Sequence, residues 1–323
     1  MPASLRFLAN RLLTTILVIV GAVALLFCLT LLVPGNPADV LLGPRATPEA
    51  VAAFSKQMGL DLPVWRRLAI FFGNVLQGNL GTDVISGRPI LTMVMEVLPF
   101  TVTLTFASIG LAILVGLPLG AYAATHPDSI GDRIGAVFSV SFIAMPNFVV
   151  AIFLLLIFSI WLDWLPVLGA GEPGNYLDQL VRLILPSVSL ALGWVGYIAR
   201  LVRSSLLEVM GEPYIRTARA YGVSDTKIIY KYALKNAAIP TVAILGLGIG
   251  RLLGGAIFAE IIFARPGIGK LVYDAILTRN YPVVQAGVLV VVLLFVLTNL
   301  LVDMSYGWLD PRMRQSARAG GGH

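Results

Sequence analysis

The chain has 323 residues, of which 58% are hydrophobic, and its mean hydropathy is +0.88. Charged residues make up 12%, about half of the roughly 25% usual in soluble proteins. This composition excludes a disordered chain, a nucleic-acid-binding domain and a typical cytosolic enzyme, and it indicates a membrane protein. The net charge of +6 fits the Lys and Arg that membrane proteins carry mostly in cytoplasmic loops.

Six apolar runs are long enough to cross a bilayer, which takes about 20 residues of helix. They span residues 12–33, 98–124, 134–161, 180–201, 241–263 and 283–306. The first run is longer than the roughly 7–15 apolar residues of a secretory signal, so it is predicted to be a membrane helix. The pattern predicts an all-α polytopic membrane protein with six transmembrane helices.

Lys and Arg set the expected orientation, because cytoplasmic loops of membrane proteins are richer in these residues. With the N-terminus inside, the inner segments carry more Lys and Arg than the outer ones. Both termini are therefore predicted to be cytoplasmic. The expected divisions are an N-terminus and first helix over 1–33, a small extracytoplasmic subdomain over 34–97, a core of five helices over 98–306, and a cytoplasmic tail over 307–323.

The long cytoplasmic segment over 202–240 alternates between helices and helix breakers. Pro213 suits the first turn of a short helix over 214–221, and Gly222 suits a left-handed cap at its end. Ser224 is placed to cap a further helix that runs to about residue 236. The pattern predicts helix, break, helix, break, helix.

The short helix carries an aromatic and alanine face, because Tyr214, Ala218 and Tyr221 are spaced at i, i+4 and i+7. Arg216 and Arg219 project elsewhere. Such a helix is typical of a knob that contacts another protein. It is equally typical of an interfacial helix whose arginines meet lipid headgroups, and these residues alone favour neither interpretation.

Residue patterns for catalysis or metal binding are missing from the sequence. A phosphate-binding loop needs Gly-x4-Gly-Lys-Ser/Thr, and the nearest string, at 267–271, lacks the hydroxyl and the leading glycine. His126 and His323 have no Cys or Glu at ligand spacing. No nucleophile elbow occurs, and no span holds a pair of carboxylates. We therefore expect no enzyme activity, cofactor or metal in this chain.

A series of short strings resembles the permeases of the dipeptide/oligopeptide/nickel family of ATP-binding-cassette (ABC) importers. The loop at 214–222, with its Arg-Thr-Ala-Arg-Ala sequence, resembles the coupling loop of that family, although Arg216 stands where many importers carry Glu. The other strings follow in the family's order over roughly residues 5–315: Pro-Gly-Asn-Pro-Ala at 34–38, Met-Gly-Leu-Asp-Leu-Pro at 58–63, Gly-Asn-Leu-Gly-Thr at 78–82, Leu-Pro-Phe-Thr at 98–101, Trp-Leu-Pro at 164–166, Phe-Ala-Glu at 258–260, Arg-Pro-Gly-Ile-Gly at 265–269, Arg-Asn-Tyr-Pro at 279–282, Asn-Leu-Leu-Val-Asp at 299–303 and Leu-Asp-Pro-Arg at 309–312. The outer subdomain points to the first of the two permease subunits.

The resemblance implies a type I ABC-importer permease fold in the bacterial inner membrane, together with a set of partners. These are a second homologous permease, two ATP-binding subunits that hold the ATP and magnesium, and an extracytoplasmic substrate-binding protein. Small residues of spans two to five would line a translocation path shared with the second permease. The short helix would dock on an ATP-hydrolysing subunit through Tyr214, Arg216, Thr217, Ala218, Arg219, Tyr221 and Gly222.

Arg251 lies near the middle of a predicted span, where a charge is costly unless it faces protein or water. It stands where the family usually has an uncharged residue. Either it faces the shared pathway and meets a substrate carboxylate, or it pairs with an acid of the partner permease or snorkels. Glu260, nine residues further on, is a second candidate pathway residue. Relatives carry dipeptides, longer peptides, glutathione, nickel chelates and opine-like compounds, and the sequence leaves this choice open.

A stand-alone secondary transporter or channel is the alternative interpretation. Such a protein would typically show internal repeats and several ionisable residues near the midplane. This sequence has one midplane charge and no repeat, and its long cytoplasmic loop would have no partner. The expected function is therefore that of a permease subunit for di- or oligopeptides or related small solutes.

Overall fold

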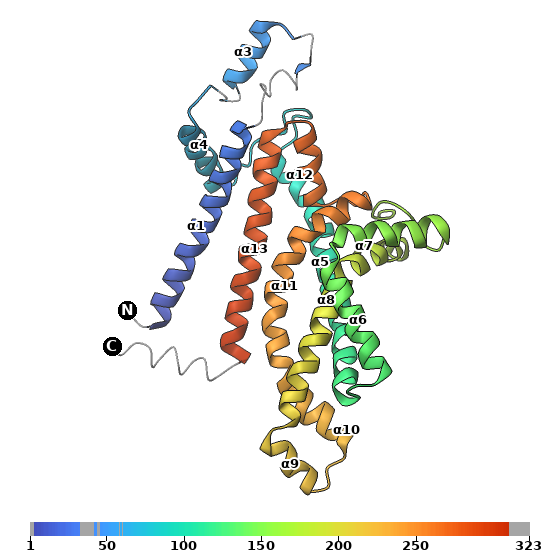
Figure 1. Cartoon of the computed structure of the whole chain (residues 1–323). Coiled ribbons are helices and arrows are strands. Elements are labelled where there is room, and N and C mark those ends of the chain that lie inside the picture. Colours follow the sequence, from blue (N-terminus) through green and yellow to red (C-terminus); the bar gives the residue numbers. More distant parts are fainter. Residues whose placement is uncertain (1–2, 33–41, 44–45, 58, 60, 310–323) are drawn as a thin grey trace. The chain divides into compact units, whose positions relative to one another are not determined.

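The structure, a computed structural model, describes residues 3–32, 42–43, 46–57, 59 and 61–309. Helices run through most of this part of the chain (Figure 1). Its residues form no strand, and Thr82 and Pro89 make an isolated antiparallel bridge. The all-α prediction is thus confirmed for the described residues.

Within these residues, four helices are long and apolar enough to cross a membrane. They are α5 (Ile90–Thr125), α8 (Tyr176–Met210), the stretch Ile244–Ile262 of α11 (Leu234–Ile262) and the stretch Tyr281–Leu301 of α13 (Tyr281–Leu309). α1 (Ala3–Leu32) adds a shorter apolar stretch, Leu13–Leu29. These five helices coincide with five of the six predicted runs. Several of these helices are longer than the predicted runs. Hydropathy identifies only the apolar part of a helix, and the backbone hydrogen bonds can continue beyond that part.

The third predicted span, 134–161, is wrong as a single helix. α6 (Ile130–Ala144) meets α7 (Asn147–Leu154) and the π-helix η1 (Leu155–Trp161), which continues it, at an angle of 108°. Met145 and Pro146 between them are extended, with ψ of 131° and 137°. Proline has no backbone N–H and disfavours helical geometry at the preceding residue, so the apolar run bends here.

The described residues fall into two compact units, of which the first contains residues up to Thr101 and the segment Pro266–Val296. α3 (Pro48–Gln57) and α4 (Val64–Leu76) follow α1 in this unit, and α12 (Ile268–Leu277) precedes α13. A core cluster joins the start of α5 to α12 and α13. Its buried members include Ile90, Val94, Ile268, Val272, Val284 and Ala286.

A second cluster in the first unit packs α4 against α1. Val23 and Phe27 of α1 are buried together with Leu289 of α13. Phe71 of α4 meets Phe27 edge-on, with ring centroids 5.8 Å apart. α4, which belongs to the predicted subdomain 34–97, therefore packs on α1 and α13, while residues 33–41 lie outside the described residues.

The second unit consists of Val102–Arg265 and the end of α13 from Leu297 onward, and it is centred on α8, against which α6, α7 and α11 pack. Glycines allow this approach: a Cβ on Gly116 would lie 2.9 Å from Ile198, and one on Gly196 would lie 2.8 Å from Ser139. Small residues have the same use at helix contacts in other membrane proteins. After α8, three short elements lead to α11. They are α9 (Pro213–Ala220), α10 (Asp225–Lys227) and the π-helix η2 (Ile228–Ala233).

Candidate functional site

α9 begins directly after the end of α8. The N–H groups of Gly211 and Glu212 bond to carbonyls of the last turn of α8, and Pro213 then occupies the first position of α9. Proline suits this position because the first N–H groups of a helix have no partner within it. Arg216 donates from Nη2 to the Gly211 carbonyl at 3.1 Å, and the Thr217 hydroxyl donates to the Pro213 carbonyl at 3.0 Å. The predicted short helix is confirmed, shifted by one residue at each end.

α9 ends in the predicted left-handed cap. Gly222 has a φ of +73°. Its N–H donates to the Arg219 carbonyl at 2.9 Å, and the N–H of Val223 donates to the Ala218 carbonyl at 3.1 Å. This pair of bonds is the Schellman motif, which satisfies the last carbonyls of a helix and needs a residue that tolerates positive φ.

Ile215 anchors α9 to the rest of its unit. It is completely buried and is the one buried residue of this helix. Burial of such a side chain stabilises by about 1.5–3 kcal/mol. Its neighbours in the cluster come from α5, α8, η2 and α11: Ala121, Ala124, Leu206, Ile228, Ala233 and Ala237. The sequence pattern missed this anchor, although Ile215 is the one large aliphatic residue of α9.

The other side of α9 is open to solvent in this chain. Tyr221 is 84% exposed and Tyr214 is 40% exposed, while Ala218 is partly buried against the anchoring cluster. The predicted aromatic and alanine face is therefore divided, with the alanine inward and the rings outward. The Tyr214 hydroxyl accepts a hydrogen bond from Asn236 Nδ2 at 2.8 Å. The ion pair of Arg219 with Asp225, at 3.5 Å between exposed side chains, adds little stability.

The chain after α9 differs from the prediction. Ser224 lies at the start of α10 with extended backbone, but its side chain accepts no capping hydrogen bond. α10, η2 and α11 then follow one another without a gap, so the helix does not end near residue 236 as predicted, and Pro240 lies inside α11. Ile228 and Ala233, five residues apart, both reach the cluster under α9, and five residues is the π-helical spacing.

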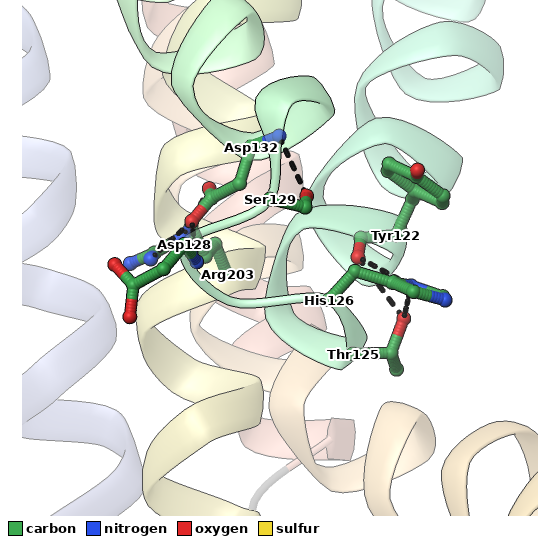
Figure 2. A network of polar contacts seen from close by, with 7 residues as sticks. All are labelled: Tyr122, Thr125, His126, Asp128, Ser129, Asp132 and Arg203. Carbon is green, nitrogen blue, oxygen red and sulfur yellow. Dashed lines mark hydrogen bonds and ion pairs between the residues drawn. The ribbon is translucent and has the colours of Figure 1, made fainter.

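A polar network ties the start of α6 to α8 (Figure 2). Arg203 of α8 donates from Nε and Nη2 to the two carboxylate oxygens of Asp132, each at 2.7 Å. Asp132 is buried and also accepts the N–H of Asp128 at 3.1 Å, while its own N–H donates to the Ser129 hydroxyl that caps α6. Bidentate pairs of this kind fix both distance and orientation. The partners are 71 residues apart, so sequence spacing offered no signal for the pair.

The end of α5 lies in the same network (Figure 2). The His126 ring stacks on Tyr122 with centroids 4.7 Å apart, and the Thr125 hydroxyl donates to the Tyr122 carbonyl at 3.0 Å. A Cβ on Gly131, in the first turn of α6, would lie 2.8 Å from the Tyr122 ring, so a larger residue there would displace this ring. Because Ala124 belongs to the cluster around Ile215, the end of α5 is in contact with the anchor of α9.

The described residues form no constellation typical of a metal site. No three His, Cys, Asp or Glu among them lie close enough to hold an ion. His126 and Asp132 are both engaged with neighbours of their own chain. The arrangement instead connects α9 with α5, α8, η2 and α11 through the apolar cluster that contains Ile215.

Arg251 and Glu260 have different surroundings on α11. The Arg251 side chain is exposed and forms no hydrogen bond or ion pair with another described residue. Glu260 is completely buried, and its charge interacts with Arg265, which is 3% exposed. Burial lowers the pKa of Arg265, and the charge of Glu260 opposes that shift.

The apolar helices and the anchored helix α9 together define a membrane-embedded subunit with a short helix presented outside its spans. The model of binding-protein-dependent transport system inner membrane components matches residues 116–315, and the model of the N-terminal part of such components matches residues 4–105. The chain belongs to this family. It is a multi-pass permease subunit of an ABC importer in the bacterial inner membrane, where it assembles with other permease and ATPase subunits.

Individual relatives are similar to this chain over nearly its whole length. The dipeptide transport system permease protein of Alkalihalophilus pseudofirmus is 37% identical, with 96% of this chain and 99% of the relative covered. The glutathione transport system permease protein of Salmonella typhimurium is 39% identical, with the same coverage. Among solved structures, the inward-facing MetNI methionine ABC transporter matches with a TM-score of 0.56 and 20% identity, over 68% of this chain and 96% of that one. This likeness shows the ABC-importer permease fold.

Proposed function

We propose that the chain carries di- or oligopeptides, or related small solutes, as the first of two permease subunits of its importer. The observation that carries this proposal is the similarity to permeases named for dipeptide, di/tripeptide and glutathione transport, which are 37–39% identical over 96% of this chain. These solutes share a peptide bond and a free carboxylate. Similarity of this extent along the whole chain supports the same class of solute.

The proposed topology has six spans, formed by α1, α5, the bent pair of α6 with α7 and η1, α8, α11 and α13. An even number places both termini on one side, and the positive-inside rule favours the cytoplasm for that side. Arg216, Arg219, Lys227, Lys231 and Lys235 all lie on or near α9, which supports a cytoplasmic position for this helix. The segment 34–97 then lies outside the cell membrane, as a small subdomain, and 307–323 forms a cytoplasmic tail.

The proposed assembly contains a second permease, two ATP-binding subunits that hold ATP and magnesium, and an extracytoplasmic binding protein. α9 docks on an ATP-binding subunit through its exposed side chains, Tyr214, Arg216, Thr217, Arg219 and Tyr221. Ala218 and Gly222 set how the helix sits on its cluster and where it ends. Movement of the ATPase passes through Ile215 to α5, α8 and α11, and through the pair of Arg203 and Asp132 to α6.

For the translocation path, we propose that Arg251 meets a carboxylate of the solute. Exposure of its side chain in the middle of an apolar helix supports this role, because an arginine that faces lipid there costs about 2.5–3.5 kcal/mol. The side chain therefore faces water or the second permease. Glu260 is buried within its own chain, so it acts on the path through its interaction with Arg265 rather than by touching the solute.

A reconstituted system tests the solute class. The two permeases and the ATPase subunits are placed in liposomes, and ATP-driven uptake of labelled dipeptides, tripeptides and glutathione is measured with the binding protein present. We expect at least one of these compounds to be taken up. Uptake that needs neither ATP nor the binding protein would contradict the proposal, as would uptake limited to solutes that contain no peptide bond.

Replacement of Tyr221 by Ala separates docking on a protein from contact with lipid headgroups. The ring is exposed and lies away from the anchoring cluster, so the fold should be preserved. Loss of a central tyrosine typically weakens an interface by about 2 kcal/mol, so we expect the ATPase to bind at least about tenfold more weakly. Tyr176→Ala, which removes another exposed ring at the start of α8, is the control. Equal ATPase binding in both variants would favour the headgroup interpretation.

Arg251→Gln tests the proposed contact with the solute. We expect normal assembly and a reduction of uptake by about tenfold or more, since hydrogen bonds to charged groups contribute about 1.5–3 kcal/mol. For an analogue whose carboxylate is amidated, uptake should differ less between the wild type and Arg251→Gln than it does for the unmodified solute. Loss of assembly would instead assign Arg251 to an ion pair with the second permease.

A further inference from the structure

The first unit contains a cavity of about 360 Å³ that the importer function leaves unexplained. Its walls come from α1, α3, α4, the turn after α4, the residue Arg279 after α12, and the start of α13. Phe27 and Phe71 form an apolar wall, and Asn74, Asn79 and Gln285 supply amide groups. A space of this size holds a small polar molecule or the head of a larger one.

Positive charge dominates the lining of the cavity. Lys56, Arg67 and Arg279 contribute to it, and none of the lining residues that the structure describes is acidic. Arg67 lies over the Phe27 ring, 5.6 Å from its centroid, and forms no ion pair with a described carboxylate. Burial lowers the pKa of Arg67, and Tyr281 opposes this shift, but an arginine remains protonated in proteins. Three cationic side chains, in a lining whose described residues include no Asp or Glu, favour an anionic occupant.

Hydrogen bonds hold two walls of the cavity together. The Asn280 side chain, which is 3% exposed, donates to the carboxylate of Asp83. This bond ties the turn that follows Asn79 and Gly81 to Asn280 after α12, and a bond from the N–H of Ile85 to Asp83, at 3.1 Å, holds the turn itself. Arg279 precedes Asn280 with a φ of +53°, a conformation that glycine adopts at less cost. Strained residues that tertiary contacts hold in place are frequent at binding sites.

The cavity lies at the ends of two apolar helices, which places it at a membrane surface. Phe27 is close to the C-terminal end of the apolar stretch Leu13–Leu29 of α1, and Tyr281 is the first residue of the apolar stretch of α13. Trp65 of the neighbouring helix α4 is 71% exposed. Exposed tryptophans collect at the level of lipid headgroups. The occupant is therefore expected to come from the headgroup layer.

We propose that this cavity binds the phosphate group of an anionic phospholipid, with Arg67 and Arg279 as its principal contacts and Lys56 at the rim. The aromatic wall accepts the first carbons next to the phosphate, and the amide groups bond to headgroup oxygens. The bound lipid would fix α4 against α1 and α13. This inference depends on the membrane position of the chain and not on the solute that it carries.

Native mass spectrometry of the assembled importer tests the proposal. The complex is placed in nanodiscs of phosphatidylcholine with or without phosphatidylglycerol, and the lipids retained after release are counted. We expect the wild type to retain phosphatidylglycerol and the double variant Arg67→Gln/Arg279→Gln to retain at least about tenfold less. Arg66→Gln is the control, because it replaces an exposed arginine of α4 that is adjacent to Arg67 and does not line the cavity.

A second arm distinguishes the lipid from free phosphate. In nanodiscs of phosphatidylcholine alone, inorganic phosphate is added at constant ionic strength and the unfolding temperature is followed. Stabilisation by phosphate that needs Arg67, without retention of phosphatidylglycerol, would overturn the lipid assignment. Equal retention in the wild type, the double variant and the control would overturn the site itself.

A single substitution provides a separate test in case the double variant does not fold. Lys56 is exposed at the rim, so Lys56→Gln should assemble normally. We expect it to reduce retention of phosphatidylglycerol severalfold. Unchanged retention in this variant, with normal assembly, would count against the proposed cavity.

Discussion

α9 and the turn over residues 79–90 are held in place by different forces. Ile215 holds α9 by burial among apolar side chains of four other elements. Asp83 holds the turn by hydrogen bonds from Ser86, Ile85 and Asn280. Apolar contact has no preferred direction, whereas a hydrogen bond weakens steeply when its angle changes. α9 is therefore suited to tilt while it stays attached, and the turn is suited to keep one shape.

The surroundings of the two regions reinforce this difference. α9 has one completely buried residue and six exposed ones, so most of its surface is free to meet a partner. In the turn, Asp83 and the neighbouring Ile90 are both buried. A segment that transmits a force needs one stable attachment and an accessible surface. A wall of a binding cavity needs several hydrogen bonds that keep its shape.

Loss of the apolar anchor should have the largest effect. Ile215→Ala removes a fully buried side chain from a cluster drawn from several helices, which typically costs about 2–5 kcal/mol. We expect α9 to detach, so that trypsin cleaves at Arg216 and Arg219 much faster in the purified complex. Ile215→Val, which typically costs about 0.5–1.5 kcal/mol, should give an intermediate rate. Leu76→Ala, at a residue 88% exposed, is the control that should leave this cleavage unchanged.

A change at the cap of α9 should have a smaller effect. Gly222→Ala places a side chain at a φ of +73°, which costs roughly 1–2 kcal/mol. We expect the end of the helix to shift and solute-stimulated ATP hydrolysis to fall, while the complex still assembles. Gly211→Ala serves as the matched control, because Gly211 has a φ of −81° that alanine adopts readily. Equal ATPase activity in both variants would show that the cap does not set the position of α9.

The hydrogen bonds to Asp83 in the turn over residues 79–90 should make the stability of the protein depend on pH. Burial would raise the pKa of Asp83, but the hydrogen bonds from Ser86, Ile85 and Asn280 outweigh it and hold the pKa below its ordinary value. The carboxylate therefore stabilises the folded state at neutral pH. This contribution is lost as the pH falls below about 4 and passes through the lowered pKa.

Asp83→Asn tests that dependence. We expect a slightly lower unfolding temperature than the wild type at pH 7 and a smaller further loss on acidification. Asp61→Asn, which removes an exposed carboxylate of the same unit, is the control. If wild type and Asp83→Asn show the same change in unfolding temperature between neutral and acid pH, the turn does not depend on the ionised carboxylate.

Much of the membrane architecture was predictable, because a run of apolar residues long enough to cross a bilayer has few other stable conformations. Five of the six predicted runs coincide with helices. The exception, 134–161, contains Pro146, and apolar content alone does not show how far a proline bends a helix. The short helix α9 was predictable for the opposite reason. Pro213 and Gly222 mark its two ends through backbone preferences that act locally.

The amino-acid sequence by itself determined the membrane class, the positions of most helices and the ends of α9, since all of these depend on hydropathy and on local backbone chemistry. Only the tertiary structure decided which residues meet. Ile215 with Leu206, Asp132 with Arg203 and Asn280 with Asp83 are pairs that no local rule predicts. The last two pairs join residues 71 and 197 positions apart. The free energy of such contacts depends on burial and on bond geometry, which are set only when the helices pack. The spacing of residues along the sequence determines neither of them.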